Sequence, residues 1–277
     1  MVRIDSVSNI VNEIIKPHKK IAIGGGAMFL KPMEIVREII RQKITNLHVV
    51  TLIGDLDIDL LIGVNAISVL DSCYIGLPMI GMARNFRNAI EKGDSLIFNE
   101  WTELSMVRAF QAGAMGTPAI MLRSLLGSDL VKLRDDFKEV IYNDKPYIEV
   151  PAITADIALI HAYAGDRNGN VYYPKHHALD DFSTLPAKVA TKLFVSVEKI
   201  ISNEEGRKLV EEGHAVMFSS LDVDYLAESP RGAWPTGFPP LYSSEMGHLM
   251  TYSGMQQSGM FDQYLEDNVY LTQQEES

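Results

Sequence analysis

Residues 21–36, IAIGGGAMFLKPMEIV, decide the fold, because an apolar run, three glycines and a proline follow one another there. Ile21–Ile23 is predicted to be a buried strand, since its residues are apolar without alternation. A helix is predicted to begin at Pro32, because a proline in the first turn of a helix removes no hydrogen bond. A strand, a glycine turn and a helix in this order are typical of α/β proteins.

The same alternation continues along the chain. Further strands are predicted at residues 46–53, 68–74, 95–98, 119–122, 157–161 and 193–197, and a helix at Glu103–Ala114. Because these strands are apolar on both faces and separated by helices, we predict a doubly wound α/β fold, a mainly parallel sheet with helices on both faces. Residues 165–173 predict a hairpin, and residues 229–242, with four prolines, predict an irregular loop. We expect one α/β domain over residues 1–242 and a partly helical C-terminal extension over residues 243–277.

The composition excludes several classes of protein. Twenty-five basic and 36 acidic residues give the 277-residue chain a formal charge of −11, which disfavours a nucleic-acid partner. The single cysteine, Cys73, excludes a disulfide framework within the chain and a multi-cysteine metal site. No apolar stretch approaches the ~18 residues of a membrane span, and the N-terminus has no apolar signal segment. We therefore expect a cytoplasmic protein with no membrane partner.

Several common functional motifs are missing from the sequence. The patterns GxxxxGK[ST], HExxH and GxSxG, which indicate phosphate binding, zinc binding and a nucleophilic serine, do not occur. The glycines do not form a dinucleotide-binding motif, because Phe29 occupies the position of its third glycine. Residues 55–59, DLDID, resemble the start of a calcium loop, but Leu60 stands where that loop needs a glycine. We expect no bound metal.

The glycines that follow the first strand are one candidate site. Glycines at the carboxyl end of a parallel strand let a ligand approach the backbone, and their N–H groups can bind an anion or oxyanion. A tight turn from strand to helix that needs a positive φ angle explains the same residues equally well.

Glu100 is a second candidate, because it follows the predicted strand 95–98 and open α/β sheets bind ligands at the carboxyl ends of their strands. Beside Trp101 its carboxylate could be partly desolvated and act as an acid, a base or a nucleophile. The simpler alternative is a solvated loop glutamate in front of a helix that Thr102 caps.

Two further strand ends carry polar residues. Arg123 and Ser124 follow the predicted strand 119–122, and Arg123 could bind a substrate carboxylate through two hydrogen bonds or pair with Asp129. His161 ends another predicted strand, where it could be a general base or a hydrogen-bonded core residue.

Taken together, several segments resemble the A (alpha) subunit of glutaconate CoA-transferase and its relatives among the family I CoA-transferases. The resemblance runs through IAIGGGAMFLKPMEIVREIIRQKITNLHVVTLIGDLDIDLLIGV, IGLPMIGMARNFRNAIEKG, EWTELSMVRAFQAGAMGTP, LRSLLGSDL, ADIALIHAYAGDRNGN, AKVATKLFVSVEKII and RGAWPTGFPPLY. It covers the chain from about Ile10 to Tyr242. Each segment alone is weakly specific, whereas their order and spacing together are distinctive.

The resemblance implies a sheet of the CoA-transferase type and an enzyme that moves CoA between an acyl-CoA thioester and a carboxylic acid. It implies a partner, the B (beta) subunit, which forms an α2β2 heterotetramer with this chain and supplies the nucleophilic glutamate in a Glu-Asn-Gly-like motif. This sequence contains neither Glu-Asn-Gly nor Glu-Ser-Gly, so the chain is expected to be catalytically incomplete alone. CoA thioester is then a substrate, with no permanently bound cofactor, and we expect an acyl group with a distal carboxylate.

The resemblance also implies which residues form the substrate-binding wall that this chain contributes. The matching positions are Gly24, Gly25, Gly26, Trp101, Thr102, Arg123 and Ser124, with the loop 232–236 as a further candidate. Some relatives on this scaffold are CoA-thioester ring hydrolases or decarboxylases, and in the hydrolases a glutamate in a Glu-Trp-Ser/Thr context is catalytic. Glu100-Trp101-Thr102 matches that context, so Glu100 is the expected catalytic residue of this chain. Three functions therefore stay open: transfer, hydrolysis or decarboxylation with Glu100 as acid/base, and non-catalytic ligand binding on the same fold.

Overall fold

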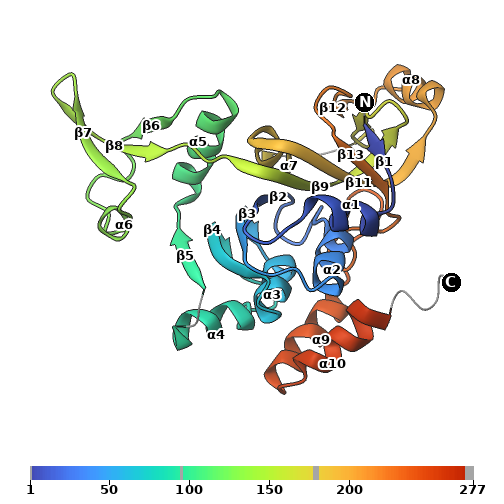
Figure 1. Ribbon diagram of the computed structural model, residues 1–277, viewed down its shortest axis with the longest axis horizontal. Helices are drawn as coiled ribbons and strands as arrows, with labels where there is room; N and C mark the ends of the chain where they lie inside the picture. Colours follow the sequence, from blue (N-terminus) through green and yellow to red (C-terminus); the bar gives the residue numbers. More distant parts are fainter. Residues whose placement is uncertain (1, 94–95, 177–180, 272–277) are drawn as a thin grey trace.

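A computed structural model of the chain describes residues 2–93, 96–176 and 181–271 (Figure 1). Ten of the described strands form one sheet, and its main path runs in the order β1-β13-β11-β9-β2-β3-β4-β5. The strands of this path, each parallel to its neighbours, are β1 (Arg3–Ile4), β2 (Lys20–Ile23), β3 (Leu47–Gly54), β4 (Ile67–Ile75), β5 (Ile97–Glu100), β9 (Ala155–Asp166), β11 (Ala190–Ile201) and β13 (Tyr225–Glu228). The predicted mainly parallel α/β sheet is confirmed.

Helices pack on both faces of this sheet, as predicted. They include α1 (Val7–Ile14), α2 (Met33–Arg41) and α3 (Leu56–Gly63) on one face, and α5 (Glu103–Ala114) and α7 (Asp181–Lys188) on the other. Successive residues of β2 divide between the two faces: Ile21 and Ile23 lie in the core with α1–α3, and Ala22 lies in the core with α5 and α7. This explains why β2 is apolar without alternation.

The order of the strands reverses beside β2. From β2 the chain adds β3, β4 and β5 on one side of the sheet, and β9, β11 and β13 lie on the other side. Open α/β sheets bind their ligands at such a switch point, outside the carboxyl ends of the strands. The turn after β2 lies at this point.

A hairpin extends β9, as the sequence predicts for residues 165–173. β10 (Val171–Tyr172) pairs antiparallel with β9 and with β12 (Val216–Phe218). The predicted irregular loop at residues 229–242 is also confirmed, since the structure there consists of turns and isolated bridges. The helix α8 (Asn203–Glu211) follows β11.

One predicted strand lies outside the main sheet. β6 (Ala119–Leu122) pairs antiparallel with β8 (Lys145–Pro151), which pairs with β7 (Lys138–Tyr142), and together they form a separate three-stranded sheet that projects from the body (Figure 1). The short helix α6 (Leu130–Leu133) lies between β6 and β7. The prediction that residues 119–122 belong to the parallel sheet is wrong. An apolar run of four residues predicts a strand but does not specify the sheet that accepts it.

The C-terminal part of the described chain is helical. It forms α9 (Met246–Gln257), α10 (Phe261–Leu265) and a π-helical turn at Glu266–Tyr270. Leu249, Tyr252 and Tyr264 belong to the core that α1–α3 form, so these helices extend that core. The helix α4 (Arg84–Lys92) precedes β5. None of the described helices is long and apolar enough to span a lipid bilayer.

Candidate active site

The glycine turn after β2 is constrained by its surroundings. Gly25 has a φ angle of 95°, and a Cβ atom there would lie 2.7 Å from the carbonyl oxygen of Leu30. A Cβ atom on Gly24 would lie 2.5 Å from the side chain of Ile160. The turn therefore requires glycine at position 25, Gly24 packs closely against Ile160, and Gly26 lines a cavity.

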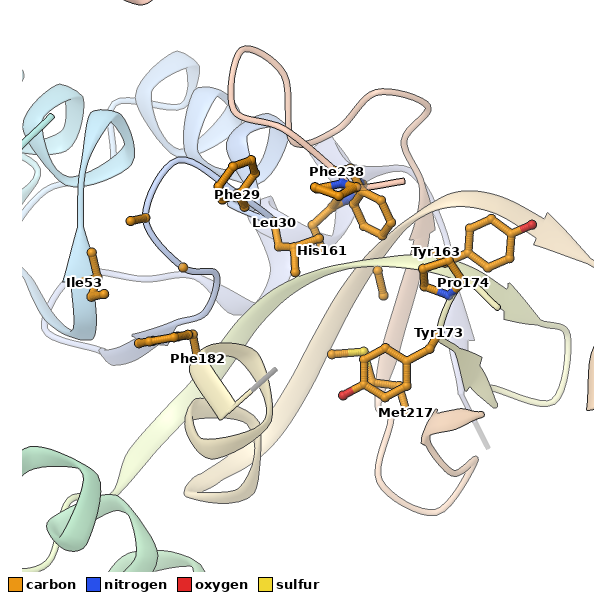
Figure 2. A pocket seen from close by; sticks show the side chains of 14 residues that line it. Phe29, Leu30, Ile53, His161, Tyr163, Tyr173, Pro174, Phe182, Met217 and Phe238 are labelled. Carbon is orange, nitrogen blue, oxygen red and sulfur yellow. The ribbon is translucent and has the colours of Figure 1, made fainter. Parts of the chain in front are cut away.

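The cavity lies where the turn after β2 meets β9. Its volume is about 460 Å3, within the range of about 300–1,000 Å3 that is usual for ligand pockets. Large apolar side chains from separate parts of the chain line it, including Phe29, Leu30, Ile53, Phe182, Met217 and Phe238. Figure 2 shows how these side chains surround the pocket.

His161 contributes a buried imidazole to the cavity wall. It lies within β9, not at the strand end that the sequence suggested, because β9 continues to Asp166. Both ring nitrogens have partners: Nδ1 lies 2.9 Å from Ser196 Oγ, and Nε2 lies 2.8 Å from Glu198 Oε1. These contacts make the imidazole part of a buried hydrogen-bond network, as the alternative of a hydrogen-bonded core residue expects, and the residue also forms part of the cavity wall.

Glu198 joins this network to the irregular loop 229–242. Its Oε1 accepts a hydrogen bond of 2.5 Å from the Tyr242 hydroxyl, and its Oε2 accepts one of 2.7 Å from the Arg231 N–H. Burial opposes ionisation of Glu198, but the hydrogen bonds from His161 and Tyr242 outweigh it and lower the pKa of the carboxyl. Burial and the nearby Glu198 carboxylate raise the pKa of Tyr242. Through these bonds Glu198 holds the loop that carries Phe238 against the sheet.

A second buried network lies beneath the glycine turn. Lys31, Asp55 and Asp57 are fully buried, with Lys31 Nζ 3.3 Å from Asp57 Oδ2. Lys31 Nζ also donates to the carbonyl oxygen of Ile53, a cavity residue. Asp55 Oδ2 accepts a hydrogen bond of 2.6 Å from the Met28 N–H, within the loop that follows the glycines. Asp55 and Asp57 thus stabilise the turn, whereas Asp59 accepts hydrogen bonds from the Tyr252 hydroxyl and the Phe86 N–H. The three aspartates therefore bind separate protein groups rather than form a calcium loop.

Burial strongly perturbs Asp55. Loss of solvent raises the pKa of its carboxyl to about 7, which Asp57 reinforces and Lys31 opposes. Asp55 Oδ1 is buried without a hydrogen-bond partner in the described part of the chain. The carboxyl is therefore easier to bury in its protonated form.

Glu100 lies at the carboxyl end of β5, as predicted, with β5 at the edge of the sheet. Its side chain is exposed, so this chain alone does not provide the desolvation that the sequence suggested. Thr102 caps α5, and its hydroxyl accepts a hydrogen bond from the Ser105 N–H. The cap matches the predicted start of α5 at Glu103.

Trp101 is buried and points into the protein. Its indole Nε1 donates a hydrogen bond of 2.8 Å to Asp71 Oδ1, while His48 Nε2 lies 2.5 Å from Asp71 Oδ2. Burial opposes ionisation of Asp71, but these two partners lower the pKa of its carboxyl. The indole thereby attaches the beginning of α5 to β4.

Arg134 completes the support of Glu100, and no sequence pattern indicates this role. Its guanidinium carbon lies 4.4 Å from the ring centroids of both Trp101 and Phe137. Its Nη1 donates a hydrogen bond of 3.0 Å to the backbone carbonyl of Glu100, and two further bonds of 2.9 and 2.8 Å join it to Asp136. Arg134 lies in the segment between α6 and β7, so only the folded chain brings it to β5.

Arg123 and Ser124 do not join the cavity described above. They follow β6, which belongs to the separate three-stranded sheet, so the expectation of an equivalent strand end in the main sheet is wrong. The loop 232–236 supplies no cavity-lining residue either, although Phe238 and Pro239 just beyond it do. The structure thus brings Gly26 and His161 to the cavity and leaves the other predicted positions outside its described lining.

The described residues offer no obvious metal site. Among them, no group of three or more His, Cys, Asp or Glu side chains is arranged to hold a metal ion. Cys73 is half-buried, and its thiol donates a hydrogen bond of 2.8 Å to the carbonyl of Leu52. Burial raises the pKa of this thiol to about 11, which disfavours a reactive thiolate.

A doubly wound sheet with an apolar cavity and a glycine turn at its switch point is typical of α/β proteins that bind small molecules. The sequence pattern of the coenzyme A transferase family matches residues 4–218, and the chain belongs to this family. The resemblance expected from the sequence is confirmed.

Three similar proteins illustrate the relationship. The A subunit of the 3-oxoadipate CoA-transferase from Pseudomonas knackmussii is 33% identical over 64% of this chain and 64% of its own length. The cholesterol ring-cleaving hydrolase IpdA subunit of Rhodococcus jostii is 30% identical over 82% of this chain and 78% of its own length. The crystal structure of glutaconate coenzyme A-transferase from Acidaminococcus fermentans superposes with a TM-score of 0.89 at 24% identity, covering 96% of this chain and 88% of that one.

These comparisons confirm the fold of the CoA-transferase type. The chain spans only 59% and 64% of the length of two of the curated relatives that it matches.

Proposed function

We propose that this chain is the A (alpha) subunit of a two-subunit CoA-transferase, which moves CoA between an acyl-CoA thioester and a carboxylic acid. The observation that carries the proposal is the apolar cavity beside the glycine turn at the switch point, in a chain of the coenzyme A transferase family. The names of relatives that are subunits of CoA-transferases support it.

The chemistry requires a carboxylate nucleophile. The carboxylate attacks the thioester carbonyl, the C–S bond breaks, and CoA leaves as a thiolate. The thiolate attacks the resulting anhydride, which releases the first acid and leaves CoA on the glutamate, and the second acid then takes over the CoA by the reverse steps. We propose that a B subunit supplies this glutamate, because the Glu-Asn-Gly motif is missing from this sequence.

This chain would contribute the surroundings of the reacting group. In the proposal, the cavity holds the acyl chain, and backbone N–H groups of the glycine turn stabilise the oxyanion. The N–H of Gly24 already donates to the carbonyl of Leu159 at 3.0 Å, so Gly25 and Gly26 are the candidates for this role. Arg123 and Ser124 remain predicted substrate contacts, which requires that assembly brings their sheet to the site.

We propose that the edge of the sheet at β5 binds the B subunit, in an α2β2 assembly. Large apolar side chains that are 47–93% exposed occur on the elements around Glu100: Tyr74, Met79, Met82, Ile97 and Leu104. Apolar side chains exposed together indicate a surface that a partner covers. A partner bound here would also remove water from Glu100.

We also propose that the complex is cytoplasmic.

The proposal is tested by purifying the chain alone and together with its B subunit, and by measuring CoA exchange between thioesters and free acids. We expect no exchange from the isolated chain and exchange from the complex. Full exchange by the isolated chain would overturn the claim that a partner supplies the nucleophile.

A second candidate is CoA-thioester hydrolysis or decarboxylation on the same scaffold, with Glu100 as acid/base. The Glu100-Trp101-Thr102 sequence and the relative named as a ring-cleaving hydrolase favour it. Under this alternative, Glu100→Ala in the complex should lower kcat about 10²- to 10⁴-fold, as loss of a general acid or base does. Glu103→Ala, another exposed carboxylate nearby, is the control. A loss of less than tenfold for Glu100→Ala would favour transfer.

A further inference from the structure

We infer that the cavity selects an apolar, branched or cyclic acyl group without a distal carboxylate. The inference rests on the proposed function, which makes an acyl-CoA thioester the ligand. It departs from the sequence-based expectation of an acyl group with a distal carboxylate.

The size and lining of the cavity indicate the shape of its ligand. A cavity of about 150 Å3 lined by aliphatic and aromatic residues binds benzene, and this one is about 460 Å3. Phe29, Phe182 and Phe238 line it together with Leu30, Ile53 and Met217. These side chains would bury a ring or a branched chain, and removal of apolar surface from water favours binding.

The charges around the cavity disfavour a second carboxylate. None of the described lining residues is a lysine or an arginine. Of the polar residues in the lining, Tyr163 and Tyr173 are phenols without positive charge, and His161 is engaged at both nitrogens. One of its partners is the Glu198 carboxylate, so His161 offers no unpaired cation to a carboxylate in the cavity. Burial of a carboxylate without a cationic partner is strongly unfavourable.

Two cations near the cavity lie outside the described lining: Lys31, whose ammonium is already paired with the buried Asp57 carboxylate, and Lys199. The Lys199 Nζ is 4.8 Å from the centroid of the Tyr163 ring, and the Lys199 side chain is exposed to solvent. A solvated ammonium at that position does not compensate a carboxylate inside the cavity.

The test uses two thioesters that differ only in the distal group: cyclohexanecarboxyl-CoA and the mono-CoA thioester of trans-cyclohexane-1,4-dicarboxylic acid. Dissociation constants are measured by titration calorimetry on the complex with its B subunit, and kcat/KM is measured for the same pair. We expect the carboxylated thioester to bind at least about 30-fold more weakly. Equal or tighter binding of the carboxylated thioester would overturn the inference.

Variants show whether the lining residues cause the difference in affinity between the two thioesters. Phe29→Arg introduces a cation into the lining at a residue that is already 42% exposed, and it should reduce the difference between the two thioesters at least about fivefold. Leu221→Arg, at a residue that is 95% exposed and outside the lining, is the control for added charge. Lys199→Ala should leave the ratio unchanged, and a large change would assign a distal carboxylate to Lys199 and contradict the inference.

The two proposals fail in different ways. Selective binding of the cyclohexane thioester without any turnover would contradict the proposed function and support the selectivity of the cavity. Turnover with preference for the carboxylated thioester would support the proposed function and contradict the selectivity.

Discussion

At the scale of single residues, the turn after β2 depends on buried residues that do not line the cavity, among them Gly25 and Asp55. Gly25 adopts a positive φ angle and lies close to the backbone of Leu30. The Asp55 carboxylate accepts a hydrogen bond from the Met28 N–H of the same loop. Asp55 is unusual because its carboxyl is buried beside Asp57 with one oxygen that has no hydrogen-bond partner among the described residues. The ionisation of this residue should therefore be visible in the stability of the protein.

We expect Asp55→Asn to remove a pH-dependent loss of stability. The folded chain holds the Asp55 proton up to about pH 7, whereas an unfolded aspartate releases it near pH 3.9. Between these values the folded state binds more protons, so the free energy of unfolding of the wild type falls as pH rises. As the pH rises from about 5 to about 8, the wild type loses this contribution and the variant does not. The free energy of unfolding of the variant should therefore increase relative to that of the wild type over this range.

Urea unfolding at both pH values measures the difference. Asp135→Asn, which changes an exposed carboxylate, is the control, and its free energy of unfolding should match that of the wild type at both pH values. Parallel pH profiles for the wild type and Asp55→Asn would contradict the assignment.

At the scale of elements, two polar residues attach loops and helices to the sheet around the site. Glu198 on β11 holds the loop 229–242, and Arg134 holds the junction between β5 and α5. Neither residue was predicted from the sequence, because both act on segments far from them in the chain.

Tyr242→Phe should loosen the loop that carries Phe238. The change removes the hydrogen bond to the Glu198 carboxylate and should cost about 1–3 kcal/mol of unfolding free energy. Because Phe238 and Pro239 line the cavity, the complex should show a higher KM with a smaller change in kcat. Tyr142→Phe, at an exposed tyrosine outside the proposed partner surface, is the control. Unchanged KM together with unchanged stability would show that the loop does not depend on Glu198.

Arg134→Lys should weaken the junction that positions Glu100, although it keeps the charge. A lysine cannot stack between Trp101 and Phe137 or bind Asp136 through two nitrogens. We expect a loss of about 1–3 kcal/mol in urea unfolding. Arg87→Lys, in an exposed ion pair with Glu91 on α4, should change stability by less than about 0.5 kcal/mol. Equal effects of the two substitutions would argue against a positioning role for Arg134.

At the scale of the whole molecule, the main sheet was largely predictable from the sequence and the site only in part. The parallel strands and α5 were predictable because local apolar periodicity and a capping threonine specify them. The placement of β6 was not, because strand pairing depends on distant partners, here β8. Gly26 was predicted at a strand end and lines the cavity, whereas Phe182 and Met217 reach it from segments that show no functional pattern in the sequence. Phe238 comes from the segment RGAWPTGFPPLY, which only the family resemblance indicated.

The central claim is that this molecule provides the cavity and that a partner subunit provides the attacking carboxylate. Mass spectrometry of the two-subunit complex, after brief incubation with an acyl-CoA and denaturation, tests it most directly. The account predicts that CoA becomes attached through a thioester to a glutamate of the partner, with no adduct on this chain. A CoA adduct on Glu100, or on any other carboxylate of this chain, would contradict it.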